Sequence, residues 1–145
     1  MFSHLGRLAV VGAAKNSGKT TTLNTIAEHE RRQGRTVGVL SIGIDGERAD
    51  VLIGTPKPPV SVHEGELLVT TSHYADEATA SFEYLRELGV KTPLGEALVV
   101  RCVEPGEVVL AGLRHRVDYD EAARELEDAG ADFVLIDGAY GRMVG

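Results

Sequence analysis

The sequence has little of what builds disulfide frameworks, zinc centres or membrane spans. The chain of 145 residues contains one cysteine, Cys102, so it offers no internal disulfide and no cysteine-based metal cluster. The five histidines have neither HxxxH nor HxH spacing, which argues against a catalytic zinc site. No apolar run approaches the roughly 18 residues of a membrane-spanning helix. We therefore expect neither a redox protein, nor a zinc enzyme, nor a membrane-spanning protein.

Basic residues are also in the minority. The 15 Lys and Arg residues stand against 22 Asp and Glu residues, and the resulting net charge of -7 disfavours nonspecific binding to nucleic acid. Residues 1–11 lack the charged start and small-residue cleavage site of a signal peptide, so we expect a cytoplasmic location. With 43% hydrophobic and 26% charged residues, the composition is that of an ordinary globular domain.

Apolar runs and glycine-bearing turns alternate at the start of the chain. Residues 7–11 form a short apolar run, a helical pattern extends from Lys19 to a stop at Gly34, and residues 36–42 form a second apolar run. Because both runs are apolar throughout, we expect parallel strands buried beneath helices. The first third of the chain thus predicts a βαβ unit.

The rest of the chain predicts a mixture of helices and strands. The expected elements are a strand over 65–71, a helix over 76–88 that buries Phe82, Leu85 and Leu88, a β-hairpin over about 97–111 that turns at Glu104, Pro105 and Gly106, a helix over 118–129, and a buried strand over 132–137. The predicted fold class is therefore α/β, with three layers and a mostly parallel sheet flanked by helices.

A candidate phosphate-binding loop lies between the first predicted strand and the first predicted helix. Its sequence, GAAKNSGKTT over residues 12–21, favours phosphate binding by backbone N–H groups and the positive end of the helix. In such a loop Lys19 neutralises the β- and γ-phosphates, and the Thr20 hydroxyl binds Mg²⁺. The expected nucleotide-binding residues are Ala14, Lys15, Asn16, Ser17, Gly18, Lys19, Thr20 and Thr21.

The loop departs from the usual motif at one position. Ala13 stands where the first glycine is expected, and Gly12 comes one place early. Alanine accepts the backbone conformation of such a loop less readily. The alternative is a helix capped by Ser17 with an exposed lysine, but that leaves the Gly-Lys-Thr-Thr sequence after a strand unexplained.

Two acids are candidates for magnesium binding and for orienting the attacking water. Asp137 ends a buried strand, as a Walker B acid does, and Asp45 follows the second strand. The expected catalytic residues are Lys19, Asp45 and Asp137. The expected metal-binding residues are Thr20, Asp45 and Asp137. Which acid binds the metal and which orients the water stays open. For Asp137 the alternative is an acid that only caps the turn after the strand.

Five segments together resemble one family within the P-loop NTPases. They are the phosphate loop, SIGIDGE over 41–47, GTPKP over 54–58, TPLGE over 92–96 and DGA over 137–139. On these segments the chain resembles the P-loop ATPase subunit of the lysine 5,6-aminomutase reactivase, which is similar to proteins encoded near ornithine aminomutase. The resemblance implies ATP-driven reactivation of a partner enzyme, a cobalamin-dependent aminomutase. Because that family continues well beyond the position of Asp137, we expect residues 1–145 to be one nucleotide-binding domain or the N-terminal fragment of a longer protein.

The expected function is Mg²⁺-dependent binding and slow hydrolysis of ATP, coupled to the remodelling of a protein partner. Two alternatives stay open: a GTP-binding adaptor in molybdenum-cofactor guanylation, which also opens with a strand and Asn-Ser-Gly-Lys-Thr, and a small-molecule kinase. No guanine-reading motif occurs, but GTP remains an alternative nucleotide. We expect no nucleic-acid or membrane partner, and a homodimer is a hypothesis because open nucleotide sites are often completed by a second copy.

Overall fold

The computed structural model describes residues 6–10, 19–42 and 59–138. The elements in chain order are β1 (Arg7–Val10), α1 (Lys19–Arg32), β2 (Val37–Ile42), β3 (Val60–Val62), β4 (Leu67–Thr71), α3 (Ser72–Glu77), β5 (Ser81–Thr92), β6 (Gly95–Glu104), β7 (Gly106–Val108), β8 (Gly112–Leu113), α4 (Arg116–Asp128) and β9 (Phe133–Asp137). The predicted βαβ unit is confirmed as β1, α1 and β2. The expected strands over 65–71 and 132–137 and the expected helix over 118–129 are confirmed as β4, β9 and α4.

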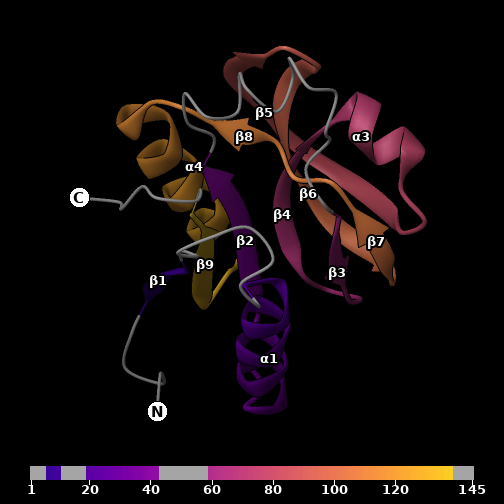
Figure 1. Ribbon diagram of the computed structural model, residues 1–145, viewed down its shortest axis with the longest axis vertical. Coiled ribbons are helices and arrows are strands. Elements are labelled where there is room, and N and C mark those ends of the chain that lie inside the picture. The colour runs from indigo at the N-terminus through magenta and orange to yellow at the C-terminus, as the bar shows by residue number, and fades with distance from the viewer. Residues whose placement is uncertain (1–5, 11–18, 43–58, 139–145) are drawn as a thin grey trace.

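A seven-stranded sheet forms the centre of the molecule (Figure 1). Its order is β1-β9-β2-β4-β6-β5, and β8 also pairs with β2. The pairs β1–β9, β9–β2, β2–β4 and β2–β8 are parallel, whereas β4–β6 and β6–β5 are antiparallel. This mixed α/β sheet, mostly parallel around β2 and flanked by helices, confirms the predicted fold class.

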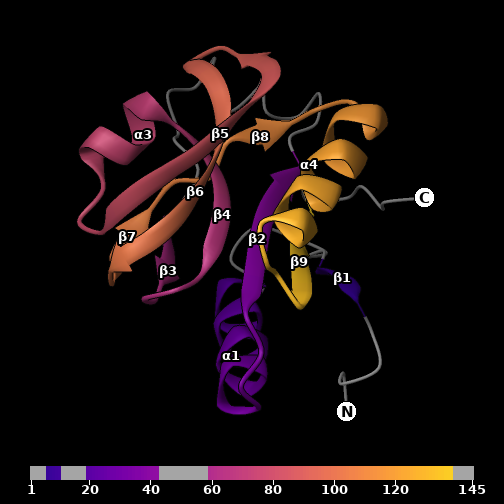
Figure 2. The ribbon, with the colours of Figure 1, turned by 180° about the vertical axis from the view of Figure 1, so that it is seen from behind.

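The two faces of the sheet are covered by different elements, as the two opposite views show (Figures 1 and 2). Along β9, Phe133 and Leu135 belong to one buried cluster, and Val134 and Ile136 belong to the other. This alternation places the two clusters on opposite faces of the strand. The first cluster includes α1 and the small β3–β7 sheet, and the second includes α4. The strands are apolar on both faces because both faces are covered.

The predicted helix over 76–88 is wrong. Residues 72–77 form the short helix α3, and residues 81–92 form β5, which pairs along its length with β6. The register of this pair shifts at several points, and the shifts break the strict alternation of a strand. Phe82 therefore packs on the first cluster while Leu85 and Leu88 pack on the second. The three-residue spacing that resembled a helix comes from a bulged strand.

The predicted hairpin also differs in its partners. An antiparallel hairpin is present, but β6 forms it with β5 and turns between Thr92 and Gly95. Since β6 already pairs with β4 and β5 on its two edges, it has no free edge for β7, which pairs with β3 instead. Gly106 is required here by close packing, because a Cβ on it would lie 2.6 Å from the backbone N of Ala80.

Candidate functional site

The candidate site lies where β1, β9 and β2 end side by side. The parallel register pairs Asp137, the last residue of β9, with Val10, the last residue of β1. On its other edge, β9 pairs Asp137 with Ser41 of β2. Adjacent strands are about 4.8 Å apart, so the end of β1 and the Asp137 backbone are direct neighbours. This is the carboxyl edge of the parallel strands, where ligands of open α/β sheets bind.

The phosphate-loop sequence connects β1 to α1 at this edge. β1 ends at Val10, and Lys19 is the first residue of α1. Leu23 and Ile26 bury one side of α1 against Val39, Phe133 and Leu135 in the first cluster. The strand before the motif and the helix after it were both predicted from the sequence, and both are confirmed. The backbone of Lys19, Thr20 and Thr21 belongs to the first turn of that helix.

Asp137 is nine-tenths buried at the end of its strand, and Ser41 beside it is fully buried. Carboxylate oxygens are the donors that Mg²⁺ prefers, and the metal is usually held by one or two carboxylates together with substrate phosphates. Within the described ranges no group of three or more His, Cys, Asp or Glu side chains could hold a metal ion. A strand-end carboxylate beside the end of β1 is chemically compatible with a magnesium site of that kind.

The remaining predicted site residues lie outside the described residues. They are Ala14, Lys15, Asn16, Ser17, Gly18 and Asp45, together with most of the 41–47 segment and all of the 54–58 segment. The 92–96 segment lies at the turn of the β5–β6 hairpin. The structure thus places Asp137 beside Val10, the last described residue before the candidate loop, and the hairpin turn belongs to a different part of the sheet.

Buried charges that the sequence reading missed hold α1 on the sheet. The side chain of Glu30 has no exposed area, and its Oε1 lies 2.8 Å from Nε of Arg35. The guanidinium of Arg35 also lies over the ring of Phe133, 5.7 Å from its centroid. Glu30 follows Leu23, Ile26 and Ala27 at helical spacing, on the side of α1 that faces the sheet. This position in the sequence pattern is the signal from which its burial could have been predicted.

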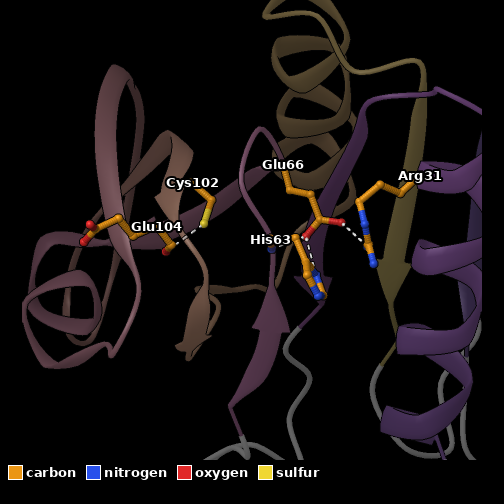
Figure 3. A network of polar contacts seen from close by, with 5 residues as sticks. All are labelled: Arg31, His63, Glu66, Cys102 and Glu104. Carbon is orange, nitrogen blue, oxygen red and sulfur yellow. Dashed lines mark hydrogen bonds and ion pairs between the residues drawn. The ribbon is translucent and has the colours of Figure 1, made fainter.

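A second carboxylate, Glu66, is buried between α1 and the start of β4 (Figure 3). Its Oε1 accepts a hydrogen bond from the backbone N–H of His63 at 2.7 Å, and its Oε2 accepts one from Arg31 at 3.4 Å. The contact with Arg31 joins the C-terminal half of α1 to the centre of the sheet. Because α1 is one continuous helix from Lys19 to Arg32, these contacts also help to position its first turn.

Cys102 is a core residue. Its thiol is buried in the first cluster with Val100 and donates a hydrogen bond to the Glu104 carbonyl at 3.2 Å (Figure 3). Burial, followed by the negative charges of Glu66 and Glu64, raises the pKa of the thiol to about 11. The thiolate is the reactive form, so this cysteine is not a nucleophile at neutral pH.

No protein-family model matches the chain, and no curated protein matches its sequence. Among solved structures, the MinC:MinD cell division protein complex of Aquifex aeolicus is similar over 96% of this chain, with 16% sequence identity and a TM-score of 0.43. The chain spans 49% of the length of that matched chain. In the part of the chain that is described, no helix has the length and apolar character needed to cross a membrane.

Proposed function

We propose that the chain binds a magnesium–nucleoside triphosphate, ATP, at the carboxyl edge of β1 and β9 and hydrolyses it slowly. The observation that carries the proposal is the position of the motif between β1 and α1, with Asp137 in register with Val10. A glycine- and lysine-bearing loop between a strand and a helix is the context that phosphate binding requires. A carboxylate at the end of the adjacent strand supplies the second part of such a site.

In this proposal the backbone of residues 14–18 and the first turn of α1 surround the phosphates. The N–H groups at the N-terminus of a helix point toward a bound anion and carry a partial positive charge. Lys19 neutralises the charge that spreads over the γ-phosphoryl oxygens during transfer, and the Thr20 hydroxyl is a metal ligand. The buried pairs of Glu30 and Glu66 hold α1 so that this first turn keeps its orientation.

Asp137 and Asp45 divide the two acidic roles. Mg²⁺, when bound, supplies charge neutralisation between the phosphates. We assign the metal-binding role to Asp137, because its strand end adjoins the end of β1. We assign to Asp45 the role of orienting the attacking water, since it follows β2 on the other side of β9. Both assignments place charges and dipoles where the transferred group develops charge, and neither needs a covalent intermediate.

We further propose that turnover remodels or reactivates a partner enzyme, a cobalamin-dependent aminomutase. The support for this partner is the resemblance of five sequence segments to the reactivase ATPase family. Slow hydrolysis suits such a role, because the nucleotide then acts as a timer for a protein complex. Sedimentation with and without Mg-ATP tests the homodimer hypothesis, and a monomer under both conditions would rule it out.

Calorimetric titration with Mg-ATP and, separately, with Mg-GTP tests the nucleotide site. We expect Lys19→Ala to weaken ATP binding at least tenfold, because a charge-assisted contact to phosphate is lost. Arg32→Ala is the matched control: it removes an exposed cation at the other end of α1, whose only described salt bridge is with Glu28, and should leave binding unchanged. A preference for GTP without turnover would favour the adaptor alternative. Absence of binding to either nucleotide by the folded protein would overturn the proposal.

A further inference from the structure

A cavity of about 210 Å³ lies among the elements that Figure 1 labels β5, β6, β8 and α4. Three parts of the chain form its walls: the β5–β6 hairpin, the end of β8 and the start of α4. Its lining residues are Val90, Lys91, Thr92, Pro93, Gly112, Leu113, Arg114, His115 and Asp118. These segments are distant in the sequence, so the cavity is a product of the fold.

The cavity shares the carboxyl edge of the parallel strands with the proposed nucleotide site. Ser41 of β2 pairs with Asp137 on one side and with Gly112 of β8 on the other. Gly112 is therefore two strand spacings, about 10 Å, from Asp137. The chain leaves β8 at Leu113 and enters α4 at Arg116, so the cavity is built from a strand-to-helix connection. Ligands of α/β sheets bind among such connections.

The lining of the cavity carries an excess of positive charge. Lys91 comes from the hairpin and Arg114 comes from the connection, whereas Asp118 is the single acid of the lining. Within the described residues neither Lys91 nor Arg114 forms a salt bridge, although the neighbouring Arg116 pairs with Asp120 at 3.7 Å. Two cations without an acidic partner, on separate elements beside one cavity, are suited to hold one anion between them.

The backbone at the same place adds donors. The N-cap residue of α4 is His115, and its side chain makes no capping hydrogen bond. The first-turn amides of Asp118 and Tyr119 bond to the carbonyl of His115, and those of Arg116 and Val117 precede them at the end of the helix. The amides of Arg116 and Val117 reinforce the two cations, because the N-terminus of a helix favours negative charge.

We propose that this cavity binds a small anionic metabolite through a carboxylate or phosphate group. The cavity of about 210 Å³ is many times the roughly 10–15 Å³ that a single water needs, so it can admit a small organic anion. The oxyanion group lies between Lys91, Arg114 and the start of α4, and the apolar part contacts Val90 and Leu113. The inference does not depend on nucleotide binding, because none of these residues belongs to the phosphate loop.

The test is a titration of ¹⁵N-labelled protein with inorganic phosphate and, separately, with malonate, followed by amide chemical shifts at low ionic strength. We expect the amides of Gly112, Arg116 and Val117 to shift together and to saturate at one dissociation constant for at least one probe. Saturation by phosphate alone identifies a phosphate-bearing ligand, and saturation by malonate alone identifies a carboxylate. The absence of saturable shifts at these amides with both probes would overturn the proposal.

Substitutions of charged side chains distinguish a specific anion site from nonspecific electrostatic attraction. Lys91→Met and Arg114→Gln should each weaken binding about tenfold, since each removes a charged contact. Arg124→Gln is the matched control, because it removes an equal charge from α4 at a residue that does not line the cavity, and it should change affinity less than about twofold. Equal losses in Arg114→Gln and Arg124→Gln would mean nonspecific attraction and refute the site.

The same titration of Lys19→Ala distinguishes this cavity from the proposed nucleotide site. The shifts of Gly112, Arg116 and Val117 should persist in that variant, because Lys19 does not line the cavity. Loss of nucleotide binding with retained shifts supports both proposals. If the shifts disappear with Lys19, the anion binds at the phosphate loop and the cavity proposal is wrong. Wild-type protein that binds phosphate at the cavity but no nucleotide would leave this inference standing and overturn the proposed function.

Discussion

At the scale of single residues, charged side chains in buried positions decide how firmly α1 is held. Glu30 is fully buried and its salt-bridge partner Arg35 is mostly buried, whereas the pair of Glu28 and Arg32 on the same helix is largely exposed. Removing one partner of a buried pair leaves the other charge without compensation, but exposed pairs contribute little. The two pairs therefore form a natural comparison within one helix.

We predict that Glu30→Gln lowers the free energy of unfolding by about 2–3 kcal/mol, because Arg35 then lacks its carboxylate in a mostly buried position. Glu28→Gln should change it by less than about 0.5 kcal/mol. Urea denaturation at neutral pH measures both values. Equal effects of the two substitutions would show that burial does not strengthen the Glu30 pair.

A second residue-scale prediction concerns pH. Arg7 of β1 donates hydrogen bonds to the Glu127 carboxylate of α4 at 2.9 and 3.0 Å. The hydrogen bond from Arg7 lowers the pKa of Glu127, and the hydrogen bond to Glu127 raises the pKa of Arg7. Since the folded-state pKa of Glu127 is below its unfolded value, its contribution is complete above about pH 4.3 and is lost as pH falls through the folded pKa. The contribution from Arg7 is lost only in strongly alkaline solution.

We therefore predict that Glu127→Gln is less stable than the wild type at pH 7 and equally stable at pH 2. Both side chains are more than one-third exposed, so the difference at pH 7 should stay under about 1 kcal/mol. Urea denaturation of both proteins at the two pH values provides the measurement, and other titrating groups affect the two proteins alike. A stability difference that persists unchanged at pH 2 would contradict the assignment.

At the scale of elements, local periodicity predicted the helices and strands correctly where the burial pattern along the element is regular. The runs that became β2 and β9 are buried on both faces, and the stripe of Leu23, Ile26 and Ala27 packs one side of α1 on the sheet. Periodicity gave the wrong element for β5, because its bulges change which of its side chains face the core. The sequence also predicted the wrong partner for β7, because strand pairing depends on which strand edges are already paired in the folded sheet. Both features depend on the tertiary structure, so no local sequence pattern predicts them.

The contact between β7 and the segment before β5 supplies an element-scale prediction. A Cβ at position 106 would lie 2.6 Å from the N of Ala80 and 2.7 Å from the carbonyl carbon of Thr79, and both are backbone atoms that cannot move independently. We expect Gly106→Ala to lower the free energy of unfolding by about 1–3 kcal/mol through overpacking. Thermal or urea denaturation tests this, with Gly6→Ala as the control, since nothing lies within 4 Å of a Cβ at that position. Comparable losses in the two variants would contradict the steric explanation.

At the scale of the whole molecule, part of the candidate site follows from the sequence and part does not. The phosphate-loop motif, the strand before it, the helix after it and the strand ending in Asp137 can all be read locally. The adjacency of β9 to β1 cannot be read in that way, because β1 and β9 lie near opposite ends of the sequence and only their parallel pairing in the folded sheet brings Val10 beside Asp137. The cavity beside β8 is likewise a product of long-range packing.

The position of Asp137 beside the end of β1 leads to a prediction that tests the roles proposed for the two acids. We predict that Asp137→Asn weakens the Mg²⁺ dependence of ATP binding, because Asp137 lies beside Val10 at the end of β1 and a carboxamide is a poorer metal ligand. Asp45→Asn should retain binding and lose about 100-fold in hydrolysis rate, as expected when a group that acts mainly in the transition state is removed. Binding by calorimetry at several Mg²⁺ concentrations and single-turnover hydrolysis measure the two effects.

Asp132→Asn is the control for this pair, because Asp132 directly precedes β9 at the opposite end from Asp137. Its carboxylate accepts a hydrogen bond from the backbone N–H of Thr36 at 2.9 Å, so its substitution changes a connection at the amino edge of the sheet and should leave both nucleotide measurements unchanged. If Asp137→Asn keeps its Mg²⁺ dependence while Asp45→Asn loses it, the two assignments are reversed. If neither variant changes binding or turnover, the carboxyl edge of β9 is not the metal site, and the register of Val10 with Asp137 serves the fold alone.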